Sequence, residues 1–471
     1  MLFNTIEFVF FLPLVVIIYY LIPQKFRWIL LLAASYYFYM SWKVEYIFLI
    51  LISTIIDYSA GLWMERMPSQ RKRLPFLILS LATNLGLLFF FKYFNFATTN
   101  LNLLFQQFAI SRELPMMKFL LPVGISFYTF QTLSYSIDVY SGRQKAERHL
   151  GYFALYVSFF PQLVAGPIER FSRLSPQLKV HHAFSYKNLA NGLRLILYGL
   201  FIKMVVADNI SGIVDQVYNA PATFDSLRIL TGIFFYSFQI YSDFYGYSII
   251  AIGSALIMGI KIMDNFKTPY LAKNISEFWQ RWHISLSTWF RDYLYFPLGG
   301  NRVKVMRWIF NIFVVFVVSG IWHGANWTFI IWGAFFGFMY LLESIANKAL
   351  NINRESPPFS WTHILLAAKT FILVTLIWVF FRSQSFDQAI QIFSLMIKNT
   401  GVQSAALNIP VSTWFFLLVF IVSDVILYNN RFDKWVGNLP DIFRWSVYGF
   451  LLFAIIVFAG VENFPFIYFQ F

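Results

Sequence analysis

Long apolar runs separated by short polar stretches repeat along the whole chain. A run of about 15 to 25 apolar residues is long enough for a helix to cross a hydrocarbon layer about 30 Å thick. The runs do not alternate with a period of two, as the strands of a membrane barrel would. The candidate runs lie near 6–22, 26–41, 44–64, 74–96, 119–137, 151–168, 188–207, 227–244, 246–262, 308–322, 326–342, 363–381, 412–428 and 445–461. Because some are short or contain proline, the pattern predicts an all-α, polytopic transmembrane bundle of about 11–14 segments.

The polar stretches predict loops and no separate soluble domain. Loops are expected at 98–116, 138–150, 169–186, 349–361, 383–411 and 429–444. None is long enough to fold alone, so we expect one membrane domain over 1–471, with its motif-bearing core at about 151–343. The first run lacks a basic region and a small-residue cleavage site, which favours a retained first span over a signal peptide.

Composition agrees with a membrane protein. Of 471 residues, 59% are hydrophobic and only 12% are charged, whereas a soluble domain is typically about a quarter charged. The net charge of +14 could suggest a nucleic-acid partner. We favour the positive-inside rule instead, which places the basic stretches 66–73 and 301–307 in the cytoplasm and leaves membrane lipid as the general partner.

One apolar run contains helix-breaking residues. In the stretch `LYVSFFPQLVAGPIER`, Pro161, Gly166 and Pro167 stand inside apolar sequence. Irregular backbone at membrane depth is tolerated only where protein or a water-filled cavity covers it. The stretch therefore predicts a broken or re-entrant helix that lines a cavity.

His323 is the strongest candidate for chemistry. It stands in `FVVSGIWHGANWTFIIWG`, sixteen residues after Arg307, which on a helix places it about 24 Å into the membrane. Ionisable groups at such depth are costly and usually functional. The alternative is a buried histidine that binds a carbonyl and locks two helices together.

A second histidine, His283, lies in `NISEFWQRWHISLSTWFRDYLYFPLGGNR`. Asn274 and Glu277 resemble a helix-capping box, and Glu277 is one turn before Arg281. We expect an amphipathic or re-entrant segment in which His283 shares a helical face with Trp279 and Ser287. The alternative is a residue of the interfacial aromatic belt.

Asp243 is the only charged residue between Arg228 and Lys261, with Gln239 one turn before it. A buried acid must be paired or protonated, and this one could orient a histidine. The alternative is a hydrogen-bonded clamp between helices.

Other chemistries lack their motifs. The sequence has no zinc motif of the H-E-x-x-H type, no phosphate-binding loop and no G-x-S-x-G turn, so we expect no metal. It also has no cysteine, which excludes a thiol nucleophile. A single deep imidazole suits a general base, which takes a proton from a hydroxyl as that oxygen attacks an acyl carbonyl.

Four motifs resemble the membrane-bound O-acyltransferase family, and within it the branch of alginate O-acetylation membrane subunits. They are `FFPQLVAGPIER` (159–170), `QIYSDFYGYSIIAIG` (239–253), `PYLAKNISEFWQRWHISLSTWFRDYLYFPLGGNR` (269–302) and `GIWHGANWTFIIWG` (320–333). Tyr245 departs from the small residue that related sequences often carry there.

The resemblance implies roles for particular residues. His323 corresponds to the family's catalytic histidine and His283 to its second one, in a ring-like bundle with a central tunnel. The candidates for lining that tunnel are Asp243, Gln239, Asn326, Trp279, Trp282 and Arg281.

The resemblance also implies a reaction. An acyl donor such as acetyl-CoA or an acyl carrier would enter from the cytoplasm, with no tightly bound cofactor. The acetyl group would pass through a bacterial inner or plasma membrane to an SGNH-type partner protein and then to a polysaccharide. Two alternatives stay open: transfer of D-alanine to teichoic acids, and a transporter or flippase without acyl transfer.

Overall fold

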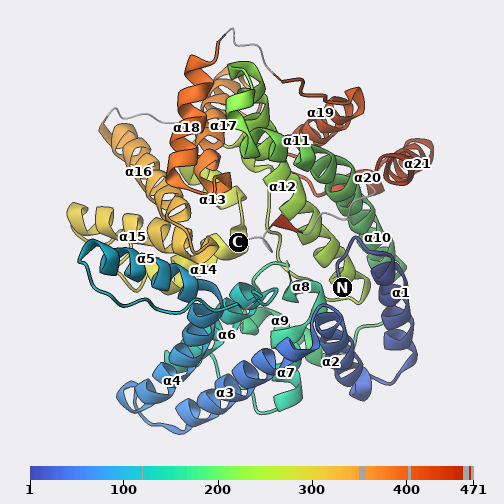
Figure 1. Ribbon diagram of the computed structural model, residues 1–471. Helices are drawn as coiled ribbons and strands as arrows, with labels where there is room; N and C mark the ends of the chain where they lie inside the picture. Colours follow the sequence, from blue (N-terminus) through green and yellow to red (C-terminus); the bar gives the residue numbers. More distant parts are fainter. Residues whose placement is uncertain (119, 165, 350–356, 401–404, 460–465, 468–471) are drawn as a thin grey trace. The chain divides into compact units, whose positions relative to one another are not determined.

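The computed structural model describes residues 1–118, 120–164, 166–349, 357–400, 405–459 and 466–467, and the regular elements in these ranges are all helices (Figure 1). Within the described residues, eight helices are long and apolar enough to cross a membrane, and two apolar helices, Ile6–Leu21 and Val411–Ile426, are shorter. The predicted all-α, polytopic class is confirmed.

The chain divides into two compact units. Unit 1 comprises Met1–Leu193 and Ala251–Met263, and unit 2 comprises Arg194–Ile250 and Asp264–Phe471. The prediction of a single membrane domain over 1–471 stays a prediction.

The elements before α10 are α1 (Ile6–Leu21), α2 (Gln24–Met40), η1 (Val44–Tyr46), α3 (Ile47–Arg66), α4 (Gln70–Leu88), η2 (Phe89–Tyr93), α5 (Phe94–Gln107), α6 (Ile125–Tyr140), α7 (Leu150–Ser158), α8 (Phe160–Leu163) and α9 (Phe171–Lys179). The next are α10 (Tyr186–Leu200), η3 (Phe201–Ala207), α11 (Asp208–Asn219), η4 (Pro221–Thr223), α12 (Ser226–Ile257), η5 (Pro269–Leu271), α13 (Ile275–Arg281), α14 (Ile284–Phe290) and η6 (Arg291–Tyr295). The last are α15 (Val305–His323), α16 (Trp327–Ala349), α17 (Trp361–Arg382), α18 (Phe386–Lys398), α19 (Val411–Ile426), α20 (Phe432–Gly437) and α21 (Asp441–Phe458).

Two predicted helix ends, one between two apolar runs and one at the start of a loop, are wrong because the helix continues through them. The runs at 227–244 and 246–262 form the single 32-residue helix α12. Gly246 lies inside it, at a point where an added Cβ would be 2.9 Å from the carbonyl oxygen of Gly199, so this glycine allows close helix packing and does not end the helix. Likewise α4, η2 and α5 form one apolar span, Gln70–Gln107, and the loop predicted at 98–116 is wrong over residues 98–107.

Three other predicted loops contain helices. Residues 169–186 include α9, residues 383–411 include α18, and residues 429–444 include α20 and the start of α21. The helix α18 begins where the Ser385 hydroxyl accepts a hydrogen bond from the backbone N–H of Gln388 (3.1 Å), a usual helix cap. Residues 350–356 and 401–404 of the predicted loops lie outside the described residues.

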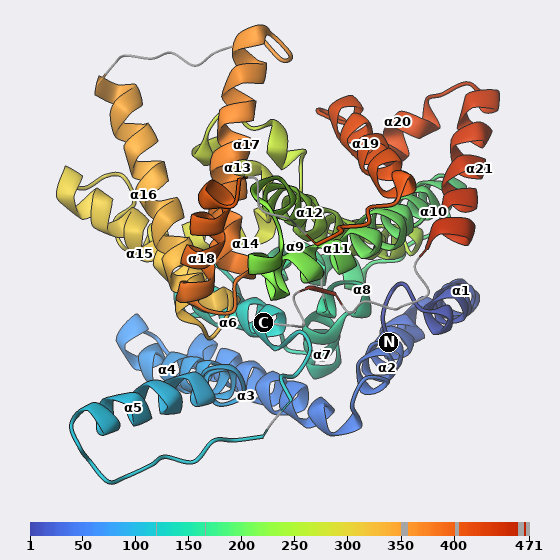
Figure 2. The same cartoon turned by 45° about the horizontal axis from the view of Figure 1, so that its top comes forward.

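In unit 1, α3, α4 and α6 lie side by side (Figure 2). Their interface holds a buried carboxylate, Asp57, which accepts hydrogen bonds from Ser80 Oγ (2.5 Å) and from Asn84 Nδ2 (2.9 Å). Buried polar groups need such partners, and here the partners join the helices.

The predicted helix break in `LYVSFFPQLVAGPIER` is confirmed. Helix α7 ends at Ser158 and α8 starts at Phe160. The break leaves the Tyr156 carbonyl outside the helical bonding pattern, where it accepts a hydrogen bond from Gln162 Nε2 (2.9 Å) and one from Gln131 Nε2. The Phe160 N–H donates to Ser35 Oγ (3.0 Å). Side chains thus satisfy the freed backbone groups, as an apolar surrounding requires.

In unit 2, α15 and α16 form a tight antiparallel hairpin (Figure 1). A Cβ added at Gly320 would lie 2.2 Å from the Phe329 carbonyl oxygen, and one at Gly333 would lie 2.2 Å from that of Phe316. Small residues at these two positions therefore let the two backbones approach closely.

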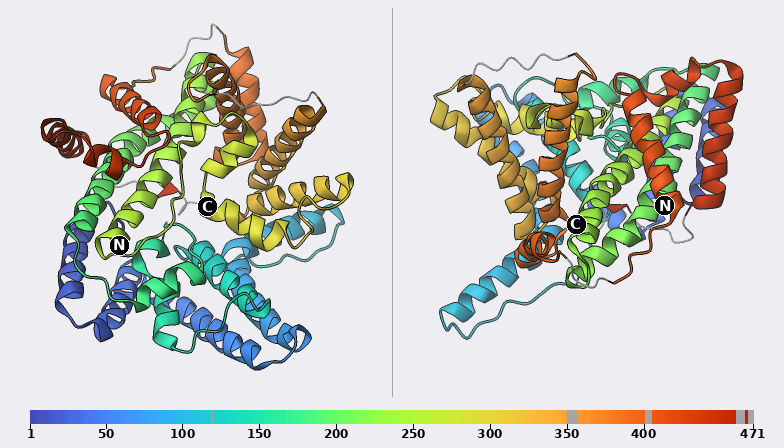
Figure 3. Two further views of the ribbon diagram at one scale, coloured as in Figure 1. Left: turned by 180° about the vertical axis from the view of Figure 1, so that it is seen from behind. Right: turned by 90° about the horizontal axis from the view of Figure 1, so that it is seen from above.

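In another part of unit 2, α19 and α21 pack against η3. Figure 3 shows these two red helices beside a green stretch of the chain. The Phe416 ring of α19 lies 4.8 Å from the ring of Phe458 at the end of α21 and 6.0 Å from that of Phe201 in η3. Aromatic packing of this kind contributes beyond the area that it buries.

Candidate active site

His323 is the last residue of α15, and only 3% of it is exposed. Three aromatic rings surround its imidazole, with centroids at 4.9 Å for Trp322, 5.0 Å for Trp332 and 5.2 Å for Phe381. All three contacts are steep, edge-on arrangements, which aromatic pairs prefer. The rings fix the position of the imidazole in an apolar enclosure.

Asn326 fixes the turn that follows His323. Its Oδ1 accepts a hydrogen bond from the Thr328 N–H (3.0 Å), and its Nδ2 donates to the Gln384 carbonyl (2.7 Å). The side chain therefore caps α16 and ties the hairpin to the residues after α17. Both hydrogen bonds of Asn326 thus hold the turn between α15 and α16 in place.

The segment that carries His283 is not one helix. Helix α13 ends at Arg281, α14 begins at Ile284, and His283 between them has φ 43° and ψ 54°. This left-handed conformation costs conformational energy in a residue with a β-carbon, and strained residues of this kind are concentrated at functional sites. The predicted helical face of Trp279, His283 and Ser287 is wrong because the backbone turns at Trp282 and His283.

The His283 imidazole is fully buried, with 0% of the residue exposed. The Phe244 ring lies edge-on at 4.7 Å and the Trp322 ring at 6.0 Å. Burial lowers the pKa of His283 to about 3, because a charged ring would lose its hydration. The alternative of an exposed ring in an interfacial aromatic belt does not fit this enclosure.

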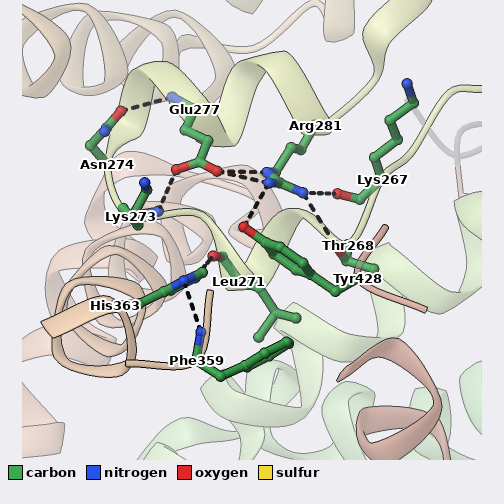
Figure 4. Close-up of polar contacts among 10 residues, drawn as sticks. All are labelled: Lys267, Thr268, Leu271, Lys273, Asn274, Glu277, Arg281, Phe359, His363 and Tyr428. Atoms are coloured by element: carbon green, nitrogen blue, oxygen red, sulfur yellow. Dashed lines mark hydrogen bonds and ion pairs between the residues drawn. The ribbon is translucent and has the colours of Figure 1, made fainter. Parts of the chain in front are cut away.

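Arg281 anchors the turn on its other side, as Figure 4 shows. Its guanidinium pairs with Glu277 (2.8 Å) and donates to the Tyr428 hydroxyl (3.0 Å) and the Lys267 carbonyl (3.1 Å). Several fixed partners hold a planar guanidinium in one orientation. Arg281 therefore acts on the turn before His283, through contacts with residues of the same unit.

The predicted cap of α13 is confirmed in its first half. Asn274 Oδ1 accepts a hydrogen bond from the Glu277 N–H (2.8 Å). The Glu277 carboxylate accepts from the N–H of Lys273 (3.0 Å), one residue before the position of a complete capping box.

The two candidate tryptophans of this segment belong to one aromatic cluster. Trp282 lies 5.1 Å from Trp378, which lies 5.6 Å from Trp332. Trp279 lies 5.8 Å from Trp332, the ring that also contacts His323. Trp279 is therefore connected to His323 through one ring, that of Trp332, and Trp282 through two, those of Trp378 and Trp332.

A cavity of about 490 Å³ lies between the α13–α14 segment and the α15–α16 hairpin. Its wall includes Trp279, Ser287, Arg291 and Phe316, and also Ser319, which is one helical turn before His323. A mostly apolar pocket with a few polar groups is typical of a small-molecule site. Of the predicted tunnel-lining residues, Trp279 lines this cavity.

Asp243 belongs to a different cluster. Its carboxylate lies 2.6 Å from Lys203 Nζ and accepts a hydrogen bond from the Ile467 N–H (2.7 Å), and the same lysine pairs with Asp208 (2.7 Å). This pairing agrees with the expectation that a buried acid is paired or protonated. Gln239 lies one turn earlier on α12 and is half-buried. The hypothesis that Asp243 orients a histidine gains no support from these contacts.

Sequence reasoning missed Lys203 and Asn265. Lys203 is the only charged residue inside the apolar run 195–207, a signal that could have been paired with Asp243. Asn265 lies in an irregular segment after α12, where its Oδ1 is 3.3 Å from His283 Nδ1. No feature of the local sequence indicates that contact.

No three His, Cys, Asp or Glu side chains within the described ranges come together in a way that could hold a metal ion.

Comparison with known proteins agrees with the motifs. Residues 147–386 match the model of the membrane-bound O-acyltransferase family. The chain is 39% identical over 416 residues to the "Probable alginate O-acetylase AlgI" of Pseudomonas putida, covering 87% of this chain and 82% of that protein. It is 37% identical over 444 residues to the peptidoglycan O-acetyltransferase of Helicobacter pylori, with 87% and 82% covered. It is 31% identical over 277 residues to the teichoic acid D-alanyltransferase of Bacillus subtilis, with 56% and 69% covered.

Proposed function

Since the chain belongs to the membrane-bound O-acyltransferase family, we propose that this O-acyltransferase moves acetyl groups from a cytoplasmic donor across the membrane to a polysaccharide. The observation that carries the proposal is the buried His323 at the end of an apolar helix, enclosed by Trp322, Trp332 and Phe381. An enclosed imidazole can accept a proton where water would otherwise hydrolyse the donor.

In the proposed step, His323 removes the proton of an acceptor hydroxyl as the hydroxyl oxygen bonds to the acetyl carbonyl carbon. The carbon–sulfur bond of a thioester donor then breaks, and the imidazolium returns the proton to the leaving thiolate. The products are an acetyl ester and a free thiol. General base catalysis of this kind typically contributes about 10²- to 10⁴-fold in rate.

We place the donor in the cavity beside Trp279. Ser319 on its wall is one turn before His323, and Trp279 is linked to His323 through Trp332. The walls are mostly apolar, which suits a pantetheine-like arm, and Arg291 supplies a positive charge for a donor phosphate. A diffusible acetyl-CoA or an acyl carrier would both present such an arm.

The choice of acetyl over D-alanyl rests on the relatives. Two named for O-acetylation are 37% and 39% identical over most of the chain, whereas the D-alanyltransferase matches 56% of it at 31%. D-alanyl transfer is thus the second candidate. A transporter without acyl transfer does not accord with membership of an acyltransferase family.

The final acceptor would be a cell-surface polysaccharide, since the relatives are named for alginate and peptidoglycan. We propose that an SGNH-type partner outside the cytoplasm receives the acetyl group and passes it on. In this proposal the acetyl donor stays on the cytoplasmic face and the acceptor on the other face of the membrane. A catalyst embedded in the membrane is therefore needed to join them.

Reconstitution in sealed vesicles tests this function. The purified chain would be supplied with radiolabelled acetyl-CoA on one face and with the partner and polysaccharide on the other. Base-labile acetyl esters on the polysaccharide support the proposal. Transfer from a D-alanyl carrier protein, with none from acetyl-CoA, would replace it with the second candidate.

A further inference from the structure

Asn265 lies under the turn that carries His283 and is almost fully buried, with 1% of it exposed. Its backbone carbonyl accepts a hydrogen bond from the Ile284 N–H (2.9 Å). Its Nδ2 donates to Ser248 Oγ on α12 (3.1 Å). Two elements therefore hold both ends of this residue in place.

The side-chain oxygen of Asn265 faces three hydrogen-bonding groups. Ser285 Oγ lies at 2.7 Å, the Ser285 N–H at 3.3 Å and His283 Nδ1 at 3.3 Å. A backbone N–H can only donate, so the atom that it faces must be the amide oxygen and not the amide nitrogen. The orientation of the Asn265 amide is therefore fixed by its surroundings.

This orientation determines the tautomer of His283. An amide oxygen has no proton to give, so the hydrogen bond to it requires a proton on His283 Nδ1. Burial lowers the pKa of His283 to about 3, so the ring is neutral and carries a single N–H proton at ordinary pH. The lone pair is then on Nε2.

We propose that Asn265 is a positioning residue that holds His283 as the Nδ1–H tautomer, so that Nε2 acts as a hydrogen-bond acceptor and not as a donor. The Nε2 lone pair of His283 then accepts a hydrogen bond from a donor group of a substrate, while His323 keeps the role of proton acceptor, and His283 cannot donate a hydrogen bond to a developing oxyanion. The role in turnover rests on the proposed acyl transfer, whereas the tautomer itself does not.

The left-handed backbone of His283 fits this role. With φ 43° and ψ 54°, the residue is held by the bonds on either side of it, between Ile284 N–H and Asn265 O and between Lys267 N–H and Arg281 O (3.0 Å). Enzymes often fix a histidine tautomer by the hydrogen bond at its other nitrogen. Here an uncharged amide does so, which leaves the ring neutral.

The direct test is nitrogen NMR of the full chain in detergent with ¹⁵N-labelled histidine. The chain has six histidines, so a His283→Gln variant identifies the His283 signals. We expect wild type to show His283 only as the Nδ1–H form. In Asn265→Leu, which keeps the volume and removes the oxygen, we expect a mixture of the two tautomers. Ser285→Ala, which removes a neighbour of the same oxygen, serves as the control and should keep the wild-type pattern.

Activity separates positioning from mere folding. With acetyl-CoA as the donor, Asn265→Leu should lose at least tenfold in kcat with little change in KM. Asn265→Asp keeps an oxygen acceptor and should retain the tautomer, while its charge shifts the acidic limb of the pH profile upward.

A folded Asn265→Leu that keeps the Nδ1–H form, or an Asn265→Asp with the wild-type pH profile, would overturn the proposal. A tautomer change in a protein without acetyl transfer would instead support the positioning role and contradict the proposed function.

Discussion

The imidazoles of His283 and His323 lie against the same indole ring, that of Trp322. Its centroid is 6.0 Å from the His283 ring and 4.9 Å from the His323 ring. The two histidines come from different segments, the α13–α14 turn and the end of α15. Trp322 therefore sets the spacing of the two candidate groups for chemistry.

Removing the Trp322 ring, which contacts both imidazoles, should reduce the rate of turnover. In Trp322→Leu each imidazole loses a packing surface and gains freedom, and a displacement of about 1 Å can cost about 10²-fold in rate. We expect kcat for acetyl transfer to fall at least tenfold in a protein that still folds. Trp361→Leu is the matched control, because Trp361 is 81% exposed. Equal activity of the two variants would remove the role assigned to Trp322.

The close packing of α15 on α16 should be needed for the position of His323. In Gly320→Ala, the new Cβ would lie 2.2 Å from the Phe329 carbonyl oxygen, so the hairpin must open. Overpacking of this kind typically costs about 1–3 kcal/mol. We expect a lower melting temperature in detergent and reduced activity. Gly86→Ala, where nothing lies within 4 Å of the added Cβ, should show neither effect.

Filling the cavity beside Trp279 should weaken donor binding. Ser319 lines this space of about 490 Å³ and is buried on α15. In Ser319→Phe a ring would occupy the site proposed for the pantetheine arm, so KM for acetyl-CoA should rise about tenfold or more. Ser319→Ala leaves the space open and should behave like wild type. An unchanged KM in a folded Ser319→Phe protein would place the donor elsewhere.

The stability of the fold should depend on His283 at acidic pH. The folded pKa is about 3, below the ordinary value of 6.5, so the unfolded chain binds a proton that the folded chain does not. As pH falls from 6.5 towards 3, this difference favours unfolding by up to about 1.4 kcal/mol per pH unit.

Melting temperatures in detergent between pH 6.5 and 3 would test whether acidification destabilises the fold through His283. Compared with wild type, His283→Gln should lose less stability on acidification. His181→Gln alters an exposed loop residue and should retain the full acid dependence. A parallel loss in wild type and His283→Gln would show that His283 does not contribute.

Local sequence signals account for the features that could be predicted. The Asn274 cap, the Glu277–Arg281 pair and the break around Pro161 each depend on residues within a few positions of one another. The helical class followed from long apolar runs, because a membrane segment must satisfy its own backbone. His323 stood out as an isolated titratable group in such a run.

The features that escaped prediction depend on contacts between distant segments. Helical spacing placed His283 on a face with Trp279, but its left-handed backbone is held by Asn265, eighteen positions earlier. From the sequence we expected that Asp243 could pair with a histidine, whereas the fold brings Lys203 to it from another helix. A period of 3.6 residues carries no information about either contact.

If His323 is the proton acceptor in acyl transfer, its loss must slow the first turnover, which single-turnover kinetics measure. The measurement is the rate of thiol release from acetyl-CoA in the presence of acceptor, for wild type, His323→Gln and the control His181→Gln. We expect this rate to fall about 10²- to 10⁴-fold for His323→Gln alone, with normal insertion and melting temperature. A folded His323→Gln protein that releases thiol and forms acetyl esters at the wild-type rate would contradict it.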